Sequence, residues 1–360
     1  MSRIIYGYSG EGSGHSSRTR EMASALEAAG HEVRLASYDR GYRNLRDDFD
    51  VLEIEGLTIS SEDNRVSLLS TIGENLKRLP HGARALGSLR DLFRQFQPHV
   101  VVCDFEPMTA YLAEHYQVPL ISLDNQHRMR YMSGSGPPGR QTAAALTRRL
   151  IQAMVPWPGV SLITALFEAP VTNPRAFVFP PIVRREVRQA EPITGDHVLV
   201  YLTSGFDSLL PEFARFGREE FRVYGYQREG QQGPLRFLPP SQQGFIDDLA
   251  SCRGVIATAG FTLLSEALYL GKPCLVLPMQ GQFEQELNAW QLETCGLGLA
   301  SSDPDEQTLG HFLYRIPEIR DRLANYPRDD GSAIKDRLNE LVADEAALAR
   351  QYQQQRTGHH

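Results

Sequence analysis

Two glycine turns, each followed by polar residues, mark the stretch 255–288 as the part of the sequence that could bind a ligand. An apolar run ends at Gly260 and a helical leucine pattern follows, then a second apolar run, 274–277, leads into a polar helix start. Two strand–turn–helix units in succession predict a parallel sheet, whose ligands bind beyond the carboxyl ends of the strands. The residues that share this crevice rim are Thr258, Gly260, Thr262, Gln280, Glu284 and Gln285.

The residue types on this rim favour a sugar linked to phosphate. Phosphate binds at helix N-termini, because free backbone N–H groups point at the ligand there. Glu266, six residues after Gly260, and Glu284 would repel a phosphate but accept hydrogen bonds from neighbouring sugar hydroxyls. The alternative is that both are solvated acids near a positive helix end. The glycine turns and glutamines beside them favour the sugar.

A histidine stands at the mouth of another glycine-rich turn, directly after the predicted first strand, 3–8. The alternating glycines of this turn include Gly12 and Gly14 and do not form GxGxxG. On their own they are weak evidence for a ligand-binding turn. His15 is more informative, because histidine is the usual general base near neutral pH. The alternative is an ordinary residue at the start of the predicted helix 16–29.

Carboxylates close a further apolar run, 99–103, at its carboxyl end. Asp104 could hold a histidine in one tautomer and stabilise its protonated ring. It could equally cap the helix that begins at Pro107. Glu11 and Glu106 lie close in sequence to the two proposed residues and are the reserve candidates.

The segment 244–273, GFIDDLASCRGVIATAGFTLLSEALYLGKP, resembles the donor half of nucleotide-sugar glycosyltransferases with the two-Rossmann-domain GT-B fold. It is most similar to the family 28 type, which includes the GlcNAc transferase of peptidoglycan precursor synthesis. The Gly260-to-Glu266 spacing and the Glu284-Gln285 pair, followed by Asn288 and Ala289, are similar to the plant-type transferases. The resemblance covers most of the C-terminal half and the first loop.

This resemblance implies roles for particular residues. It places the backbone of Ile246 at the base of the nucleotide, His15 as the base that deprotonates the acceptor, and Asp104 as the group that holds His15. It also places Gly12 and Gly14 in the acceptor-side loop. Many relatives have a histidine where this chain has Thr258, so the grip on diphosphate must depend on backbone N–H groups near Thr262 and at a further glycine turn, Ser204 and Gly205.

Composition narrows the class of protein. A length of 360 residues indicates two domains, and a net charge of −7 argues against a nucleic-acid partner. Four cysteines without CxxC spacing indicate a reduced, cytoplasmic protein, and polar residues after Met1 argue against a signal peptide. No DxD or His/Cys set at ligand spacing is present, so no metal is expected. The amphipathic helix 143–157 could rest on the inner membrane face, although an ordinary core-packed helix is the favoured interpretation.

We therefore expect an α/β protein of two Rossmann-like domains with the active site in the cleft between them. The predicted parts are an acceptor-side domain 1–166, a linker 167–192, a donor domain 193–330, and a C-terminal helix and tail 331–360. The expected function is inverting, metal-independent sugar transfer from a nucleotide diphosphate donor, a UDP-sugar substrate, to a hydroxyl of a glycan, lipid or small molecule, with no cofactor. The alternatives are a hydrolysing UDP-GlcNAc 2-epimerase and a catalytically silent sugar-nucleotide-binding protein.

Overall fold

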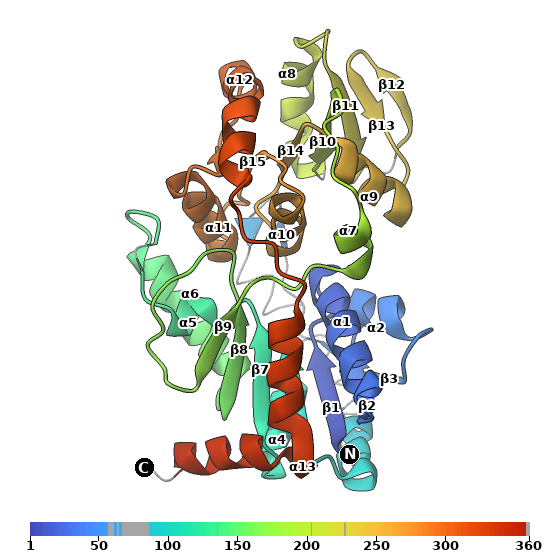
Figure 1. Cartoon of the computed structure of the whole chain (residues 1–360), viewed down its shortest axis with the longest axis vertical. Helices are drawn as coiled ribbons and strands as arrows, with labels where there is room; N and C mark the ends of the chain where they lie inside the picture. Colours follow the sequence, from blue (N-terminus) through green and yellow to red (C-terminus); the bar gives the residue numbers. More distant parts are fainter. Residues whose placement is uncertain are drawn as a thin grey trace.

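Two α/β units stacked along the long axis make up the chain (Figure 1). The computed structural model describes residues 1–56, 61–62, 65–66, 86–134, 136–202, 204–226 and 228–357. Each unit is built on one seven-stranded sheet, as the strand–turn–helix pattern predicts. The predicted class, α/β with two Rossmann-like domains, is confirmed.

The first sheet is parallel throughout, in the order β3-β2-β1-β6-β7-β8-β9. Its inner strands are fully buried apolar runs, because helices cover both faces. The strands are β1 Arg3–Tyr8, β2 Glu32–Ser37, β3 Val51–Glu53, β6 Val100–Asp104, β7 Leu120–Asp124, β8 Val160–Thr164 and β9 Ala176–Phe179. The helices are α1 Gly14–Ala28, α2 Asp39–Leu45, residues 86–96, α4 Pro107–His115, α5 Arg128–Tyr131 and α6 Gln141–Met154.

The second sheet has the order β12-β13-β11-β10-β14-β15-β16 and is parallel except for the edge strand β12. Its strands are β10 His197–Tyr201, β11 Glu220–Tyr224, β12 Gly230–Gln232, β13 Leu235–Phe237, β14 Gly254–Ala257, β15 Cys274–Val276 and β16 Gly298–Ala300. Its helical segments are α7 Arg185–Gln189, η1 Ser204–Leu209, α8 Leu210–Ala214, α9 Gln242–Ser251, α10 Phe261–Tyr269, α11 Phe283–Thr294 and α12 Glu306–Leu323. A separate antiparallel pair joins β4 Ser61–Glu62 to β5 Arg65–Val66.

The predicted linker contains a strand of the first sheet, so the domain boundary needs correction. The sequence favours 161–166 as the last strand of the first domain, but β9 follows it in the chain and pairs with β8 at the sheet edge. An edge strand tolerates the prolines next to it, since only one side of it must donate to a neighbour. The connection therefore begins after Phe179. Val187 of α7 already packs in the core of the second unit.

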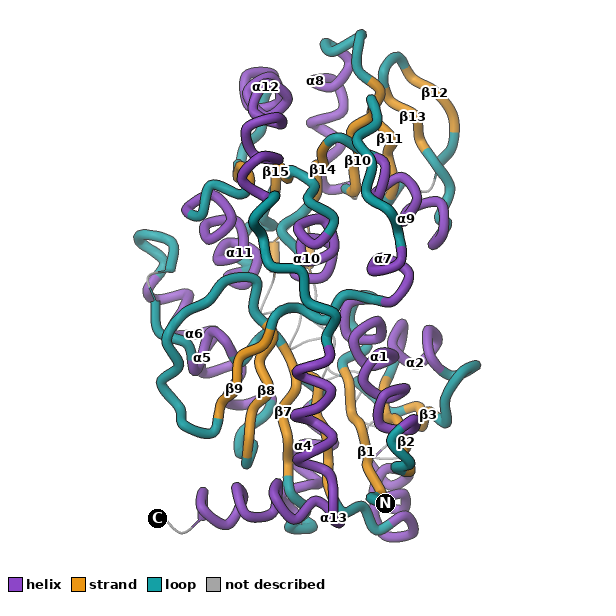
Figure 2. The backbone as a smooth tube through the Cα atoms, viewed as in Figure 1, coloured by secondary structure: helices purple, strands orange, loops and turns teal. Residues whose placement is uncertain are grey.

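The C-terminal helix α13, Ser332–Thr357, returns to the first unit. Ile334, Leu338 and Leu341 are buried against α1 and the strands of the first sheet. Residues 343–346 leave helical geometry, so the second part of α13 turns aside (Figure 2). The C-terminal helix of the predicted part 331–360 therefore packs against the first unit.

Two stretches of the sequence that suggest a helix and a loop lie outside the described residues or mostly so. The predicted helical region 68–79 is outside them, and so is most of the predicted polar loop 58–65. In the parts of the chain that the structure describes, no helix has the length and apolar character needed to cross a membrane.

Candidate active site

The carboxyl ends of the two sheets face each other, and the proposed residues of both units meet there. Glu284 of α11 accepts a hydrogen bond from Asn125 Nδ2, just after β7, at 2.7 Å. A Cβ atom placed on Gly14 of α1 would lie 2.4 Å from Thr262 Oγ1 of α10, so only glycine fits this contact between the units. Parallel strands release their following residues at one edge, and two such edges form this cleft.

The side chains of His15 and Asp104 are directly hydrogen-bonded, as the sequence suggested they could be. His15 Nδ1 lies 2.8 Å from Asp104 Oδ1, and the carboxylate is fully buried while the histidine side chain is 13% exposed. Among the described residues no hydrogen bond reaches His15 Nε2. A carboxylate on one ring nitrogen leaves the other free to take a proton, which is the arrangement of an oriented general base.

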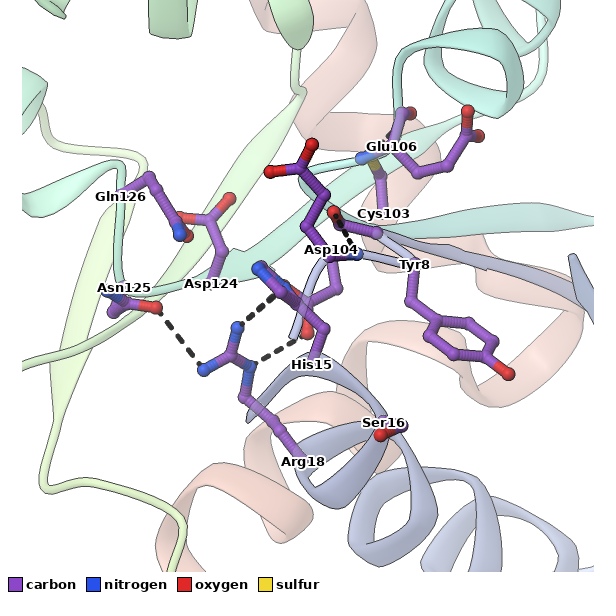
Figure 3. Close-up of polar contacts among 12 residues, drawn as sticks. Tyr8, His15, Ser16, Arg18, Cys103, Asp104, Glu106, Asp124, Asn125 and Gln126 are labelled. Carbon is purple, nitrogen blue, oxygen red and sulfur yellow. Dashed lines mark hydrogen bonds and ion pairs between the residues drawn. The ribbon is translucent and has the colours of Figure 1, made fainter. Parts of the chain in front are cut away.

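Arg18 completes this cluster and was missed by sequence reasoning. Its Nε and Nη2 donate to the two oxygens of Asp104 at 2.8 and 2.7 Å (Figure 3). Burial alone would raise the pKa of Asp104, but the Arg18 guanidinium and the His15 ring hold that pKa below its ordinary value. The carboxylate therefore stays ionised. The available signal was spacing, since Arg18 stands three residues after His15 on one helix face.

Glu106 is the helix cap that Asp104 was suspected to be. Its two carboxylate oxygens accept from the backbone N–H groups of Met108 and Thr109 at 2.8 and 2.7 Å, at the start of α4. Burial raises the pKa of this carboxyl group, and the hydrogen bonds from Thr109 and Met108 counteract that rise. Because both oxygens are engaged in capping, the geometry favours Asp104 over Glu106 as the partner of the base.

Two helix N-termini open into the cleft beside this cluster. The N-cap residues of α1 and α10 are Ser13 and Gly260, neither side chain caps its helix, and no acid lies in either first turn. The Gly14–Thr262 contact brings these two positive helix ends together. Their combined N–H groups and dipoles favour an anion between the units.

Glu284 is tied to the first unit by two amides that the sequence analysis left without a role. Asn125 bonds one oxygen and Gln126 Nε2 approaches the other at 3.4 Å. Asn125 Oδ1 in turn accepts from Arg18 Nη1 at 3.3 Å (Figure 3). A continuous chain of contacts therefore runs from His15 to Glu284. The missed signal was the polar run that begins at the carboxyl end of β7.

Glu266 is placed differently from its expected position on the rim. It is 2% exposed, and both its oxygens accept from Arg184 of the interdomain connection, at 2.6 and 2.8 Å. Burial raises the pKa of Glu266, and the Arg184 charge opposes that rise. Glu266 is therefore not a free acceptor in this structure, and a ribose would have to share it with Arg184.

The remaining predicted donor residues divide between the rim and the core. Gln285 supports the loop before α11, accepting from the Met279 N–H at 3.1 Å and donating to Gln282 at 2.7 Å. Gln280 is exposed, Thr258 is partly buried, and Ser204 and Gly205 begin η1. Ile246 is buried in the core of the second unit, next to Phe245, whose ring packs edge-on against Tyr201 and Tyr224.

Within the described ranges, no three or more histidine, cysteine, aspartate or glutamate side chains are grouped so as to hold a metal ion.

This combination of two Rossmann-like sheets and a cleft with an oriented histidine defines a glycosyltransferase of the GT-B architecture. The family model of glycosyl transferase family 1 matches residues 2–317, and the chain belongs to this family. The resemblance to nucleotide-sugar glycosyltransferases is thereby confirmed, and the narrower likeness to the family 28 type stays a prediction.

Similar proteins agree with this assignment. An uncharacterized glycosyltransferase of Methanosarcina acetivorans is 28% identical over 343 residues, covering 85% of this chain and 88% of that protein. The glycotransferase of kitacinnamycin has the same fold, with a TM-score of 0.68, 16% identity, and coverage of 96% of this chain and 99% of that one. The Streptomyces sp. SF2575 glycosyltransferase SsfS6, solved in complex with thymidine diphosphate, has a TM-score of 0.56 at 16% identity, over 94% of this chain and 100% of that one.

Replacing Arg18 by methionine should destabilise the fold by about 3–5 kcal/mol at pH 7, because the buried Asp104 charge loses its principal partner. In the wild type the pKa of Asp104 is lowered, so its stabilisation is present above the unfolded carboxyl pKa, about 3.9, and is lost as pH falls through the folded value. Without Arg18, burial raises the pKa of Asp104. The difference in free energy of unfolding between the wild type and Arg18→Met should therefore narrow towards pH 4. Urea unfolding at several pH values measures this difference.

Arg20→Met is the matched control, because Arg20 pairs with Asp48 at the exposed surface. This variant should lose less than about 1 kcal/mol of unfolding free energy, and the loss should be nearly independent of pH. If Arg18→Met behaves like Arg20→Met, Arg18 does not hold the Asp104 charge.

Proposed function

We propose that the protein transfers a sugar, with inversion and without a metal, from a nucleoside diphosphate donor to a hydroxyl acceptor. The observation that carries this proposal is the His15–Asp104 pair, at 2.8 Å, which lies at the N-terminus of α1 and meets the uncapped N-terminus of α10 across the cleft. His15 Nε2 takes the acceptor proton as the acceptor oxygen attacks the anomeric carbon. The bond to the diphosphate breaks on the opposite face, and the diphosphate leaves with the electron pair. A single displacement of this kind inverts the anomeric centre.

The leaving group would lie between α1 and α10. Charge grows on the diphosphate as the bond breaks, and preorganised N–H groups stabilise developing charge without a metal. Backbone N–H groups at Ser204 and Gly205 would also bind the diphosphate. The nucleobase of the donor would lie near Ile246. The structural neighbour SsfS6 was solved with thymidine diphosphate, so dTDP is the competitor to our preferred UDP.

The sugar would lie at the start of α11, where Glu284 and Gln285 offer acceptors and donors to hydroxyl groups. Glu266, shared with Arg184, would face the ribose. Both rival functions, 2-epimerisation and silent binding, would use the same donor site. They differ from transfer in their products: an epimerised sugar, or no released nucleotide at all.

The proposed donor site predicts that removing Glu284 lowers the affinity for the sugar part of the donor specifically. Glu284→Ala should weaken the binding of the sugar nucleotide by about 1.5–3 kcal/mol, the range for hydrogen bonds to a charged group, and the binding of bare UDP much less. Isothermal titration calorimetry with UDP-sugars and with UDP gives both constants.

Glu286→Ala is the control for Glu284→Ala, since Glu286 occupies the same first turn but pairs with the exposed Arg140. Equal losses for sugar nucleotide and UDP in Glu284→Ala would place Glu284 away from the hexose.

The mechanism predicts that His15→Ala lowers turnover by about 10²–10⁴-fold, the usual contribution of a positioned base, with little change in donor affinity. Asp104→Asn keeps the size of the side chain and should also lower turnover, because the carboxylate charge steadies the protonated ring. Release of the nucleotide in the presence of a panel of acceptors measures both, and His311→Ala, an exposed histidine, is the control. Near-normal turnover in His15→Ala, together with inactive Glu106→Gln, would transfer the role of base to Glu106.

A peripheral contact with an anionic membrane is a second proposal, supported by the face of α6. Leu146, Leu150 and the following Trp157 are 55%, 47% and 44% exposed, while Ile151 is the buried residue of α6. Tyr111 of α4, 47% exposed, packs edge-on against Trp157. The exposed basic side chain of Arg149 lies beside this apolar face, as at an interfacial helix.

Leu150→Asp should therefore reduce co-flotation with anionic liposomes at low salt, because a carboxylate opposes both apolar burial and charge attraction. The control is Tyr314→Asp, which makes the same change at an exposed apolar residue distant from α6. Leu263→Asp would not serve as a control, because Leu263 packs against the core of the donor domain. Absence of wild-type flotation ends the membrane proposal without touching the transferase.

A further inference from the structure

Arg128 is a buried cation whose direct partners are neutral. It begins α5, after the polar run that follows β7, and is 4% exposed. Its Nη2 donates to Asn288 Oδ1 at 2.5 Å and its Nη1 to Gln291 Oε1 at 3.2 Å, both amide oxygens. Its Nε has no hydrogen-bond partner among the described residues. Burying a guanidinium without a carboxylate is costly, so a residue placed in this way calls for an anion.

The side chain reaches from the first unit to the start of α10. Its guanidinium carbon lies 5.6 Å from the ring centre of Phe261, the first residue of α10. Asn288, which it contacts, donates from Nδ2 to the carbonyl oxygen of Ala259 at 2.8 Å. Arg128 is therefore one hydrogen-bonded side chain away from the turn that leads into Gly260. This turn is the uncapped helix end at which we place the diphosphate.

Three other arginines that the structure describes around the cleft are already neutralised. Arg18 is paired with Asp104, Arg184 with Glu266, and Arg140 with Glu286. Burial lowers the pKa of Arg128, and the charge of Glu284 counteracts that lowering, although no ion pair joins these two described side chains. Thr258 adds no charge to the turn.

We propose that Arg128 supplies, from the acceptor-side unit, the positive charge that the donor's diphosphate needs at the N-terminus of α10. This inference rests on the proposed function. A bound diphosphate would compensate the burial of the guanidinium. The same charge would stabilise the leaving group as the glycosidic bond breaks, because its negative charge increases in the transition state. Donor binding would also draw the two units together, since the cation and the helix end belong to different units.

The competing explanation is that Arg128 only joins the units. Calorimetry with UDP and UMP separates the two, repeated with dTDP and dTMP if the wild type prefers thymidine nucleotides. Arg128→Met should weaken diphosphate binding by about 10- to 100-fold, the size of a charge-assisted hydrogen bond, and monophosphate binding at least several-fold less. Arg128→Lys should recover part of the loss, because it restores the charge without the planar fork.

Arg140→Met is the matched control, because it removes another arginine contact between the units and should leave both affinities near the wild-type values. The ligand-free unfolding midpoint of each variant checks folding, and the upward shift produced by saturating UDP should shrink in Arg128→Met alone. Equal losses for diphosphate and monophosphate, or an unchanged diphosphate affinity, would overturn the role of Arg128. Wild-type protein that binds neither nucleoside diphosphate would overturn the proposed function as well.

Discussion

The buried carboxylate of Asp104 is the constraint on which the active-site side of the molecule depends. A charge at the end of a fully buried strand is tolerated only with partners, and Arg18 and His15 provide them. These partners set the orientation of α1 against β6. The same ion pair therefore fixes both the packing of the first helix and the direction in which His15 presents its free nitrogen. Stability and the proposed chemistry share one group here.

The contacts between the two units extend this constraint across the cleft. Asn125 links Arg18 to Glu284, so the proposed base and the proposed sugar-binding acid belong to one network of contacts. Away from the cleft centre, α13 returns the chain to the first unit, and Arg184 of the connection pairs with Glu266 of the second unit. The residues closest to the centre use amides and a buried arginine in place of carboxylate pairs. A polar but incompletely neutralised interface suits a cleft that must admit an anionic ligand.

The described buried charges around the cleft thus fall into two groups. Asp104, Glu266 and Glu106 are each satisfied within the chain, by arginines or by helix N–H groups. Arg128 is bonded to amides alone, and the N-termini of α1 and α10 carry no acid. The first group stabilises the ligand-free fold. The second group leaves positive potential between the units, where we propose that the leaving group is held.

The sequence by itself determined the local elements and the class of the fold. Apolar runs closed by glycine turns predicted parallel strands and helices, because strand and helix periodicity are properties of neighbouring residues. His15 follows the first glycine turn and Asp104 ends a predicted strand, and the resemblance to nucleotide-sugar glycosyltransferases implied that the two residues pair. The edge strand β9 was missed because four apolar residues between prolines carry little local signal, and its pairing with β8 is a tertiary contact.

Only the tertiary structure decided how the polar residues share their partners. Glu266 and Glu284 look alike in sequence, yet Arg184 covers one and Asn125 reaches the other. Glu106 and Asp104 stand two residues apart, yet one caps a helix and the other holds the histidine. Arg18 and Arg128 are ordinary arginines until their surroundings are known. Charge partners come from distant parts of the chain, so burial and pairing depend on how the two units pack.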